Sequence, residues 1–212
     1  AVLELLQNRA SYADRLLLPG MLGGGEPCTE SPRNIELAKQ KMAEAGYPDG
    51  IDEVFDVITP AWNNNIKILE IYQQNLKEIG ININISAMDT SAYNEARNNG
   101  QFKIAWGNVV AAYPDSDAMV YPTFYSGSIG AAGNYARYSN PEVDALIEKA
   151  RASTDDAERD QLYRQIDDLV LADLPYAYLD HNIYVDICQP YVKNYCPSAL
   201  DVSTYHRVWL DK

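Results

Sequence analysis

The run Trp62-Asn-Asn-Asn-Ile-Lys-Ile-Leu-Glu-Ile-Tyr-Gln-Gln-Asn-Leu-Lys-Glu-Ile-Gly-Ile-Asn-Ile-Asn-Ile-Ser86 contains the change of periodicity that decides the fold. From residue 62 to residue 79, apolar or aromatic side chains recur every three or four positions, which predicts an amphipathic helix. Gly80 ends that helix, and from residue 81 isoleucine alternates with asparagine or serine, which predicts a half-buried strand. The chain therefore passes directly from helix to strand, as α/β domains do.

The same signals, followed outward in both directions, predict the other elements. Ser31-Pro32 begins a helix that ends at Gly46, and Pro141 begins another. We expect helices over 31–45, 90–98, 141–150 and 155–174, and strands over 52–59, 102–110, 176–180 and 183–187, the last two on either side of a turn at Asp180-His181-Asn182. Residues 1–31 and 111–139 are too rich in Gly, Pro and polar residues for continuous regular structure. The alternation predicts an α/β fold with a mixed sheet flanked by helices.

The composition excludes several classes of protein. The 212 residues carry 30 acidic and 17 basic side chains, a net charge of −13, and 47% of them are hydrophobic. This is typical of a globular chain rather than a disordered one. A protein that binds nucleic acid needs a basic surface, so we expect no nucleic-acid partner. No stretch approaches the ~20 apolar residues of a membrane span. Because the chain lacks an initiating methionine and a signal peptide, we interpret its N-terminus as a processed or truncated end.

Motifs for catalysis, cofactors and metals are absent from the sequence. There is no Gly-x-Ser-x-Gly motif, and neither His181 nor His206 stands beside a candidate nucleophile with an orienting acid. The glycines at 23–25 are not followed by the Lys-Ser/Thr of a phosphate-binding loop. Asp115 and Asp117 suit a helix cap better than a cation site. We therefore expect a protein that is not an enzyme and has no cofactor or metal, with an acidic hydrolase as the less favoured alternative.

Tyrosine and cysteine give the remaining residue-level signals. Of the 16 tyrosines, five follow the strand expected at 102–110: Tyr113, Tyr121, Tyr125, Tyr135 and Tyr138. Ligands of α/β proteins often lie just beyond strand ends, and tyrosine rings hold polar ligands by stacking and hydrogen bonding, so this region is a candidate binding rim. Cys188 and Cys196 either close a loop as a disulfide or remain separate thiols, with Cys28 left over.

Three segments resemble a known family. They are Ala38-Lys-Gln-Lys-Met-Ala-Glu-Ala-Gly-Tyr-Pro-Asp-Gly50, the helix–Gly–strand of residues 71–85, and Tyr138-Ser-Asn-Pro-Glu-Val-Asp-Ala-Leu-Ile147 with the segments 159–163, 173–175 and 208–212 that follow it. Their order and spacing resemble the C-terminal part of the bacterial extracellular solute-binding proteins of family 5, the peptide, nickel and opine receptors of ABC importers. The resemblance extends over essentially the whole chain.

The resemblance implies a fold, a partner lobe and a location. The chain is expected to form one lobe of a type II periplasmic-binding-protein clamshell, whose other lobe precedes it. Residues 1–31 would lead in from that preceding lobe, 32–187 would form the α/β substrate-binding lobe, and 188–212 would be a tail that returns toward the other lobe. The protein would be exported, either periplasmic or lipid-anchored at the cell surface. Such a compartment permits a Cys188–Cys196 disulfide.

The resemblance also implies where the ligand binds. Family peptide receptors commonly read Gly-Trp-x-x-Asp-Tyr-x-Asp/Glu-Pro after the strand here expected at 102–110, and the first Asp pairs with the α-amino group of the peptide. The matching residues in this chain are Asn108, Val109, Val110, Ala111, Ala112 and Tyr113, with Val109 in place of the aromatic residue and Ala112 in place of that Asp. By position, Tyr93, Arg97 and Trp106 could also line the cleft, and an arginine would suit a carboxylate or phosphate.

The expected function is that of the substrate-binding component of an ABC importer. It would capture an oligopeptide or a related small polar solute between two lobes and deliver it to a membrane permease. Because an ammonium group is costly to bury without a counter-charge, Ala112 favours a ligand other than a free-amine peptide. The alternatives are an opine, a sugar conjugate, a metal chelate or haem as ligand, or a structural interaction module.

Overall fold

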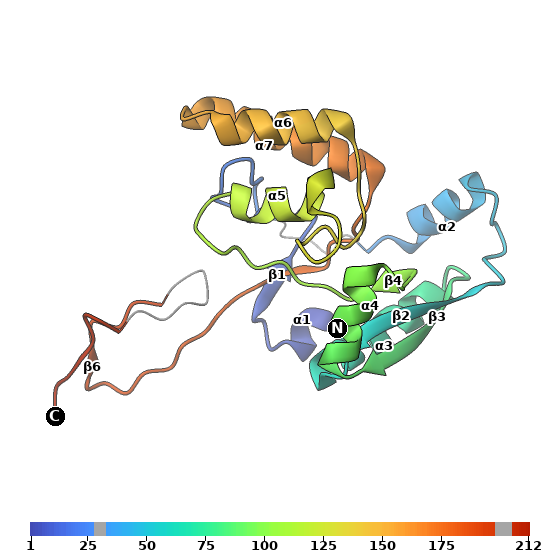
Figure 1. Ribbon diagram of the computed structural model, residues 1–212. Coiled ribbons are helices and arrows are strands. Elements are labelled where there is room, and N and C mark those ends of the chain that lie inside the picture. The colour runs from blue at the N-terminus through green and yellow to red at the C-terminus, as the bar shows by residue number, and fades with distance from the viewer. Residues whose placement is uncertain (28–32, 198–204) are drawn as a thin grey trace.

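The main sheet of the computed structural model, which describes residues 1–27, 33–197 and 205–212, has three parallel strands in the order β3-β2-β4 (Figure 1). They are β2 (Val54–Pro60), β3 (Asn82–Met88) and β4 (Ile104–Ala105). The helix α3 (Asn63–Lys77) connects β2 to β3, and α4 (Thr90–Asn99) connects β3 to β4. Since all three strands run in the same direction, the residues that follow them come together at one edge of the sheet.

The alternating isoleucines explain why this unit folds as it does. Ile83 lies opposite Phe55 in the register of β3 and β2, and Ile83 and Val57 are buried together with Leu69 of α3. The polar residues between the isoleucines face away, and Asn84 donates a hydrogen bond to Asp56 Oδ1 at 2.7 Å on the neighbouring strand. The predicted helix at 62–79 and strand at 81–86 are therefore confirmed, with small shifts of their ends.

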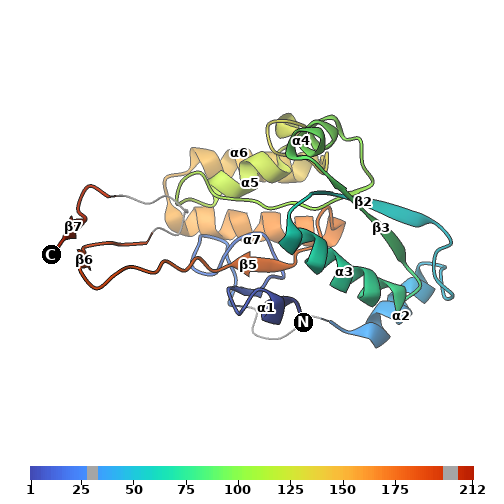
Figure 2. The same ribbon diagram turned by 90° about the horizontal axis from the view of Figure 1, so that it is seen from below.

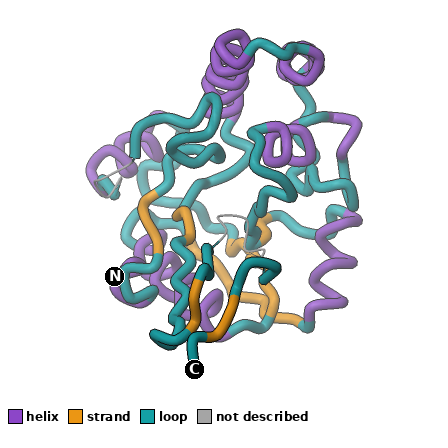
Figure 3. The backbone as a smooth tube through the Cα atoms, turned by 90° about the vertical axis from the view of Figure 1, so that its left-hand side faces the viewer, coloured by secondary structure: helices purple, strands orange, loops and turns teal. Residues whose placement is uncertain are grey.

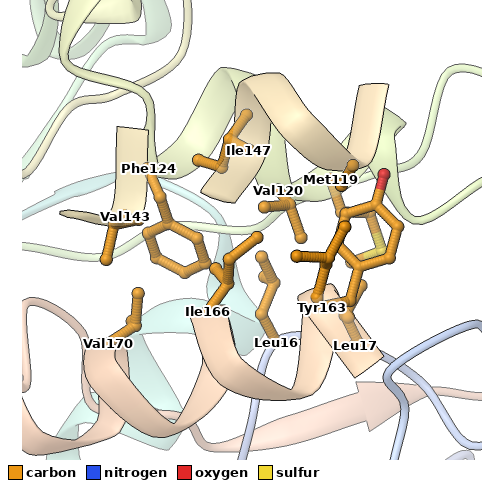
Figure 4. Packing of buried hydrophobic residues seen from close by; sticks show 12 residues of the cluster. Leu16, Leu17, Met119, Val120, Phe124, Val143, Ile147, Tyr163, Ile166 and Val170 are labelled. Atoms are coloured by element: carbon orange, nitrogen blue, oxygen red, sulfur yellow. The ribbon is translucent and has the colours of Figure 1, made fainter. Parts of the chain in front are cut away.

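A larger core joins the helices α5 (Asp117–Phe124), α6 (Pro141–Ala152) and α7 (Asp156–Asp173). Figure 4 shows side chains from these three helices and from the N-terminal segment pointing toward one another. The fully buried members are Leu17, Val120, Phe124, Val143, Ile147, Ala150, Tyr163, Ile166 and Val170. The predicted starts of the two long helices are confirmed, because Asn140 and Asp155 accept hydrogen bonds from the first backbone amides of α6 and α7.

Short strand pairs bring distant parts of the chain together. β1 (Ala10–Tyr12) pairs antiparallel with β5 (Asp180–Asn182), with Ser11 opposite His181. β6 (Val192–Lys193) pairs with β7 (Trp209–Leu210) in a hairpin that stands away from the body of the protein (Figures 1 and 2). The strands are grouped in the lower half of the view in Figure 3. The remaining elements are α1 (Val2–Leu5), α2 (Ile35–Glu44) and the 3-10 turn η1 (Ser126–Ser128).

The N-terminal third differs from the prediction in two respects. Residues 1–31 are not irregular throughout, because they include α1 and β1, and Leu16 and Leu17 lie in the helical core. The helix α2 begins at Ile35, and none of its residues is buried. The expected start at Ser31-Pro32, and Cys28, lie outside the described residues.

Three differences concern the second half of the chain. The strand expected at 102–110 is reduced to β4, because no strand of the described part of the chain pairs with residues 107–110, which are exposed. The region 111–139 contains α5 and η1 despite its Pro122. The strands expected at 176–180 and 183–187 are wrong, since the residues expected to form the turn between them are themselves β5, paired with the N-terminal segment.

Candidate functional site

A cleft opens where the three parallel strands end. It has a volume of about 190 Å³ and lies beside Pro60 at the end of β2, Thr90 at the start of α4 and Trp106 just after β4. Its lining residues are Pro60, Trp62, Thr90, Tyr93, Asn94, Arg97, Trp106 and Asn108. The carboxyl edge of a parallel sheet is where α/β proteins commonly bind their ligands, so this position agrees with a binding role.

The structure brings together four of the nine residues predicted for the ligand site. Tyr93, Arg97, Trp106 and Asn108 all line the cleft. The run 109–113 continues past it toward α5: Val109, Val110, Ala112 and Tyr113 are exposed, and Ala111 packs on the helical core. Sequence reasoning missed Pro60, Trp62, Thr90 and Asn94. Pro60 and Trp62 come just after the predicted strand 52–59, Thr90 begins the helix predicted at 90–98, and Asn94 lies one turn further along that helix. Their positions after predicted strands could have identified them.

Trp106 is fixed by its backbone. Its amide donates a hydrogen bond to Ile58 O at 2.9 Å, and its carbonyl oxygen accepts one from the Tyr93 hydroxyl group. The Tyr93 side chain is buried, and this burial raises the pKa of its hydroxyl group, so it remains a hydrogen-bond donor at neutral pH. The helix α4 and the end of β4 are thus joined underneath the cleft, which gives Trp106 a defined position.

Arg97 supplies the one charged side chain among the described residues that line the cleft. Its guanidinium carbon lies 3.8 Å from the centre of the Tyr135 ring and 5.1 Å from that of Tyr93. Its Nη2 donates to Asn94 Oδ1 at 3.3 Å, while its buried Nε has no hydrogen-bond partner in the described part of the chain. Two aromatic rings therefore hold a cation whose donors are only partly used.

The segment that leaves the cleft is anchored at Asp115. Its Oδ1 accepts a hydrogen bond from the Asp117 amide at 2.8 Å and another from Arg159 Nη2 at 2.6 Å. The predicted capping role is wrong, because the N-cap residue of α5 is Ser116 and no side chain caps this helix end. The Arg159 hydrogen bond holds the pKa of this carboxyl below its usual range. Asp117 accepts a hydrogen bond from the Tyr113 hydroxyl, which raises the pKa of Tyr113 to about 12. The C-terminal end of the segment after the cleft is therefore tied to the fold.

The tyrosines of the predicted rim do not form one surface. The rings of Tyr121 and Tyr125 stack on each other with centres 4.8 Å apart, and both pack on the helical core. Tyr138 packs edge-on against Phe124 and donates a hydrogen bond to Asp173 at 2.6 Å. Of the five, Tyr135 approaches the cleft, through its contact with Arg97.

The described residues show no sign of a metal site or a membrane-spanning helix. They contain no cluster of His, Cys, Asp or Glu side chains that could hold a metal ion, and no helix long and apolar enough to cross a membrane. Cys188 and Cys196 are both free and exposed, so the disulfide permitted by the resemblance is not formed. The strand between them, β6, is instead held by its pairing with β7.

Comparison with known proteins gives related sequences and folds. Residues 1–131 match the profile of "Bacterial extracellular solute-binding proteins, family 5 Middle". Over its full length the chain is 27% identical to heme-binding protein A of Haemophilus influenzae, and over 70% of its length it is 31% identical to the glutathione-binding protein GsiB of Pectobacterium atrosepticum. These matches cover 39% and 30% of the two relatives, so the chain spans well under half of their length.

Solved structures show the same fold. The oligopeptide-binding protein AppA of Bacillus subtilis, in complex with a nonapeptide, superposes with a TM-score of 0.77 at 25% identity, covering 100% of this chain and 44% of that one. The murein tripeptide binding protein MppA of Escherichia coli gives a TM-score of 0.80 at 17% identity, covering 98% of this chain and 41% of that one. The expected fold class, an α/β lobe of a periplasmic binding protein, is confirmed. With a family profile that matches more than half of its residues, the chain belongs to family 5 of the bacterial extracellular solute-binding proteins.

Proposed function

We propose that this chain is part of the substrate-binding component of an ABC importer, which captures an oligopeptide or a related small polar solute and delivers it to a membrane permease. The observation that carries the proposal is the cleft at the carboxyl edge of the sheet. It is lined by two indoles, amide and hydroxyl groups and one cation, and by no pair of carboxylates or activated nucleophile among the described residues. Such a surface can bind and orient a polar solute, but it offers no general acid, base or nucleophile.

The proposed ligand site extends beyond the cleft itself. Tyr93, Arg97, Trp106 and Asn108 would form its floor, and residues 109–113 its exposed rim. Trp62 is 56% exposed and Val110 53%, which is unusual for side chains beside a binding site that is complete. A second, preceding lobe that covers the cleft would shield the Trp62 and Val110 side chains from water. Closure of two lobes on the ligand would then provide the signal that the permease reads.

The C-terminal tail supports the same arrangement. Ile187 is 94% exposed, and Tyr184, Val185, Trp209 and Leu210 are also exposed along the extended segment and the β6–β7 hairpin. Apolar side chains in such a row favour burial against another surface. In the proposed receptor, residues 188–212 return to the preceding lobe, and residues 1–31 lead in from it. The protein would be exported, in the periplasm or lipid-anchored at the cell surface.

The alternatives to a peptide receptor differ either in the solute that is bound or in the presence of catalysis. The relatives are named for heme, glutathione and oligopeptides, and Ala112 lacks the carboxylate that the family pattern places opposite a peptide amine. A non-peptide ligand, such as an opine, a sugar conjugate, a metal chelate or haem, is the second candidate. An acidic hydrolase is the third, and it would require turnover by the isolated chain.

Native mass spectrometry of the intact protein, purified without refolding, tests the proposal. We expect a small solute to be retained, to dissociate on denaturation, and to be lost from a Trp106→Ala variant but kept by Trp209→Ala, which changes an indole of the tail. The 212-residue chain alone should bind the released solute weakly, because half of the envelope is absent. Nanomolar binding by the chain alone, turnover of chromogenic esters or glycosides, or no retained solute would contradict the proposal.

A further inference from the structure

The charge of the cleft is opposite to that of the chain. The chain carries 30 acidic and 17 basic residues, and most described arginines are paired: Arg15, Arg33, Arg151, Arg159 and Arg164 each form an ion pair with a carboxylate. Arg97 has no carboxylate partner among the described residues, and no acidic side chain lines the cleft beside it. An arginine left unpaired in so acidic a protein, at the edge of a cleft, is available to an anion from outside.

We propose that the cleft binds the carboxylate of a solute with a flat or apolar body, and that Arg97 is the residue that recognises this carboxylate. The inference rests on the proposed binding function and names the class of solute. The Tyr135 and Tyr93 rings lie against the guanidinium group, with their centres 3.8 and 5.1 Å from its carbon, and Nη2 is bonded to Asn94. No carboxylate of the described chain pairs with this group, and an arginine and a carboxylate can form two parallel hydrogen bonds.

A second feature of the cleft also favours an anion. The helix α3 begins directly at the cleft, since its N-cap residue is Trp62, and no side chain caps this end. The helices α2, α4, α6 and α7 are capped by Asn34, Asp89, Asn140 and Asp155, whereas α1 and α5, like α3, have no side-chain cap. The first turn of a 15-residue helix carries unsatisfied amides and a partial positive charge. A negative group in the cleft would be stabilised by this helix end as well as by Arg97.

The amount of positive charge selects a carboxylate over a phosphate. One arginine and one helix end balance about a single negative charge, whereas a phosphate monoester carries nearly two at neutral pH. The rest of the lining fits the body of the solute: the indoles of Trp62 and Trp106 offer flat apolar surface, and Asn108 can pair with a polar group. We therefore expect an organic monoanion or one carboxyl end of a larger solute.

The three tryptophans make the test direct. Trp62 and Trp106 line the cleft and Trp209 lies in the tail, so the indole NH signals of the 212-residue chain in ¹H–¹⁵N spectra report binding with an internal control. The probes are hippurate, an aromatic carboxylate without an amine, and its neutral amide, hippuramide. We expect hippurate to shift the Trp62 and Trp106 signals but not that of Trp209, with an affinity about tenfold higher than that of hippuramide.

Variants assign the effect to the arginine. Arg97→Gln should reduce hippurate binding to the level of hippuramide, and Arg97→Lys, which keeps the charge without the fork, should recover only part of it. An unchanged midpoint of thermal unfolding in both variants, compared with the native chain, shows that the fold is retained. Equal affinities of the two probes, no shift with hippurate, or tighter binding of phenyl phosphate would overturn the inference. A solute that the intact protein retains equally well in Arg97→Gln would overturn it too, while leaving the binding function in place.

Discussion

The guanidinium group of Arg15 lies 3.0 Å from the carboxylate of Asp167 (Nη1 to Oδ2), and this pair joins the segment after β1 to the middle of α7. Asp167 is 3% exposed, whereas Arg15 reaches the surface and also pairs with Asp14 at 3.1 Å. The Nε2 atom of His181 on β5 lies 3.1 Å from Arg15 O. The segment after β1, the helix α7 and the strand β5 are far apart in sequence, and they meet around Arg15 and the buried carboxylate of Asp167.

Replacement of Asp167 by Asn is expected to change the dependence of stability on pH. Burial raises the pKa of Asp167 from its usual 3.8 to about 6, against the opposing effect of Arg15. Between these values the folded state binds more protons than the unfolded state, so the contribution of Asp167 to stability is full below pH ~4 and is lost as the pH rises through ~6. In denaturant titrations, Asp167→Asn should gain roughly 3 kcal/mol relative to the native protein between pH 4 and pH 7.

Asp168 provides the control for this measurement, because it is the next residue on the same helix but is exposed. Asp168→Asn keeps the buried Asp167 and removes only one of the lesser causes that raise its pKa, so this variant should retain most of the pH dependence of the native protein. A constant difference between Asp167→Asn and the native protein would show that the Arg15 pair keeps Asp167 ionised at low pH, and would contradict the argument from burial.

The N-terminal segment offers a test of its place in the core. Gly23 has φ of +76°, and a Cβ atom added there would lie 2.3 Å from Tyr163 Cβ on α7. Gly20 has φ of +88° but no atom within 4 Å of the same position. Gly23→Ala should therefore cost about 2–4 kcal/mol of unfolding free energy, from overpacking added to backbone strain. Gly20→Ala, which adds the strain alone, should cost about 1 kcal/mol. Equal costs in thermal or chemical denaturation would place residues 20–25 outside the core.

Local patterns predicted the elements that their own side chains define. The isoleucines at 81, 83 and 85 predicted β3, and Asn140-Pro141 and Asp155 predicted the starts of α6 and α7, because capping and alternation act over a few residues. The strand β5 was missed because its sequence, Asp-His-Asn, has no alternation. Its partner, β1, lies about 170 residues away, and only the tertiary fold makes it a strand.

The sequence also predicted only part of the candidate site. Asn108 could be placed near the cleft because the resemblance locates the ligand segment there, and Tyr93, Arg97 and Trp106 by their position relative to that segment. The region 111–139 has no continuous regular structure, as expected, but the helix α5 within it could not be located from the sequence, because Pro122 lies inside it and glycines follow it. The contact of Tyr135 with Arg97 could not be predicted, since it depends on how the chain returns after α5.

Arg159 is expected to position the segment that leaves the cleft. It is 14% exposed and donates hydrogen bonds to Asp115, to the Ala150 carbonyl oxygen and to the Tyr163 hydroxyl group. Arg159→Met removes all three and leaves Asp115 without its counter-charge, so a loss of about 3 kcal/mol is expected in chemical denaturation. Arg164→Met removes an exposed pair with Asp160 on the same helix and should cost less than about 1 kcal/mol. Similar losses for the two variants would show that Arg159 has no such role.

The last prediction concerns Ala112, where the family pattern has a carboxylate that pairs with a peptide amine. Ala112 is exposed beside the cleft, so an aspartate there can be accommodated without disturbing the core. In the intact protein, closure would bury this position, and a buried ammonium group is stable only beside a negative charge. Ala112→Asp should therefore raise the affinity for trialanine relative to N-acetyl-trialanine by about tenfold or more, measured by calorimetry. Ala112→Asn, which has the same shape without the charge, should leave the ratio unchanged. An unaltered ratio in Ala112→Asp would show that the ligand amine lies elsewhere, because a new carboxylate next to a buried ammonium cannot be without effect.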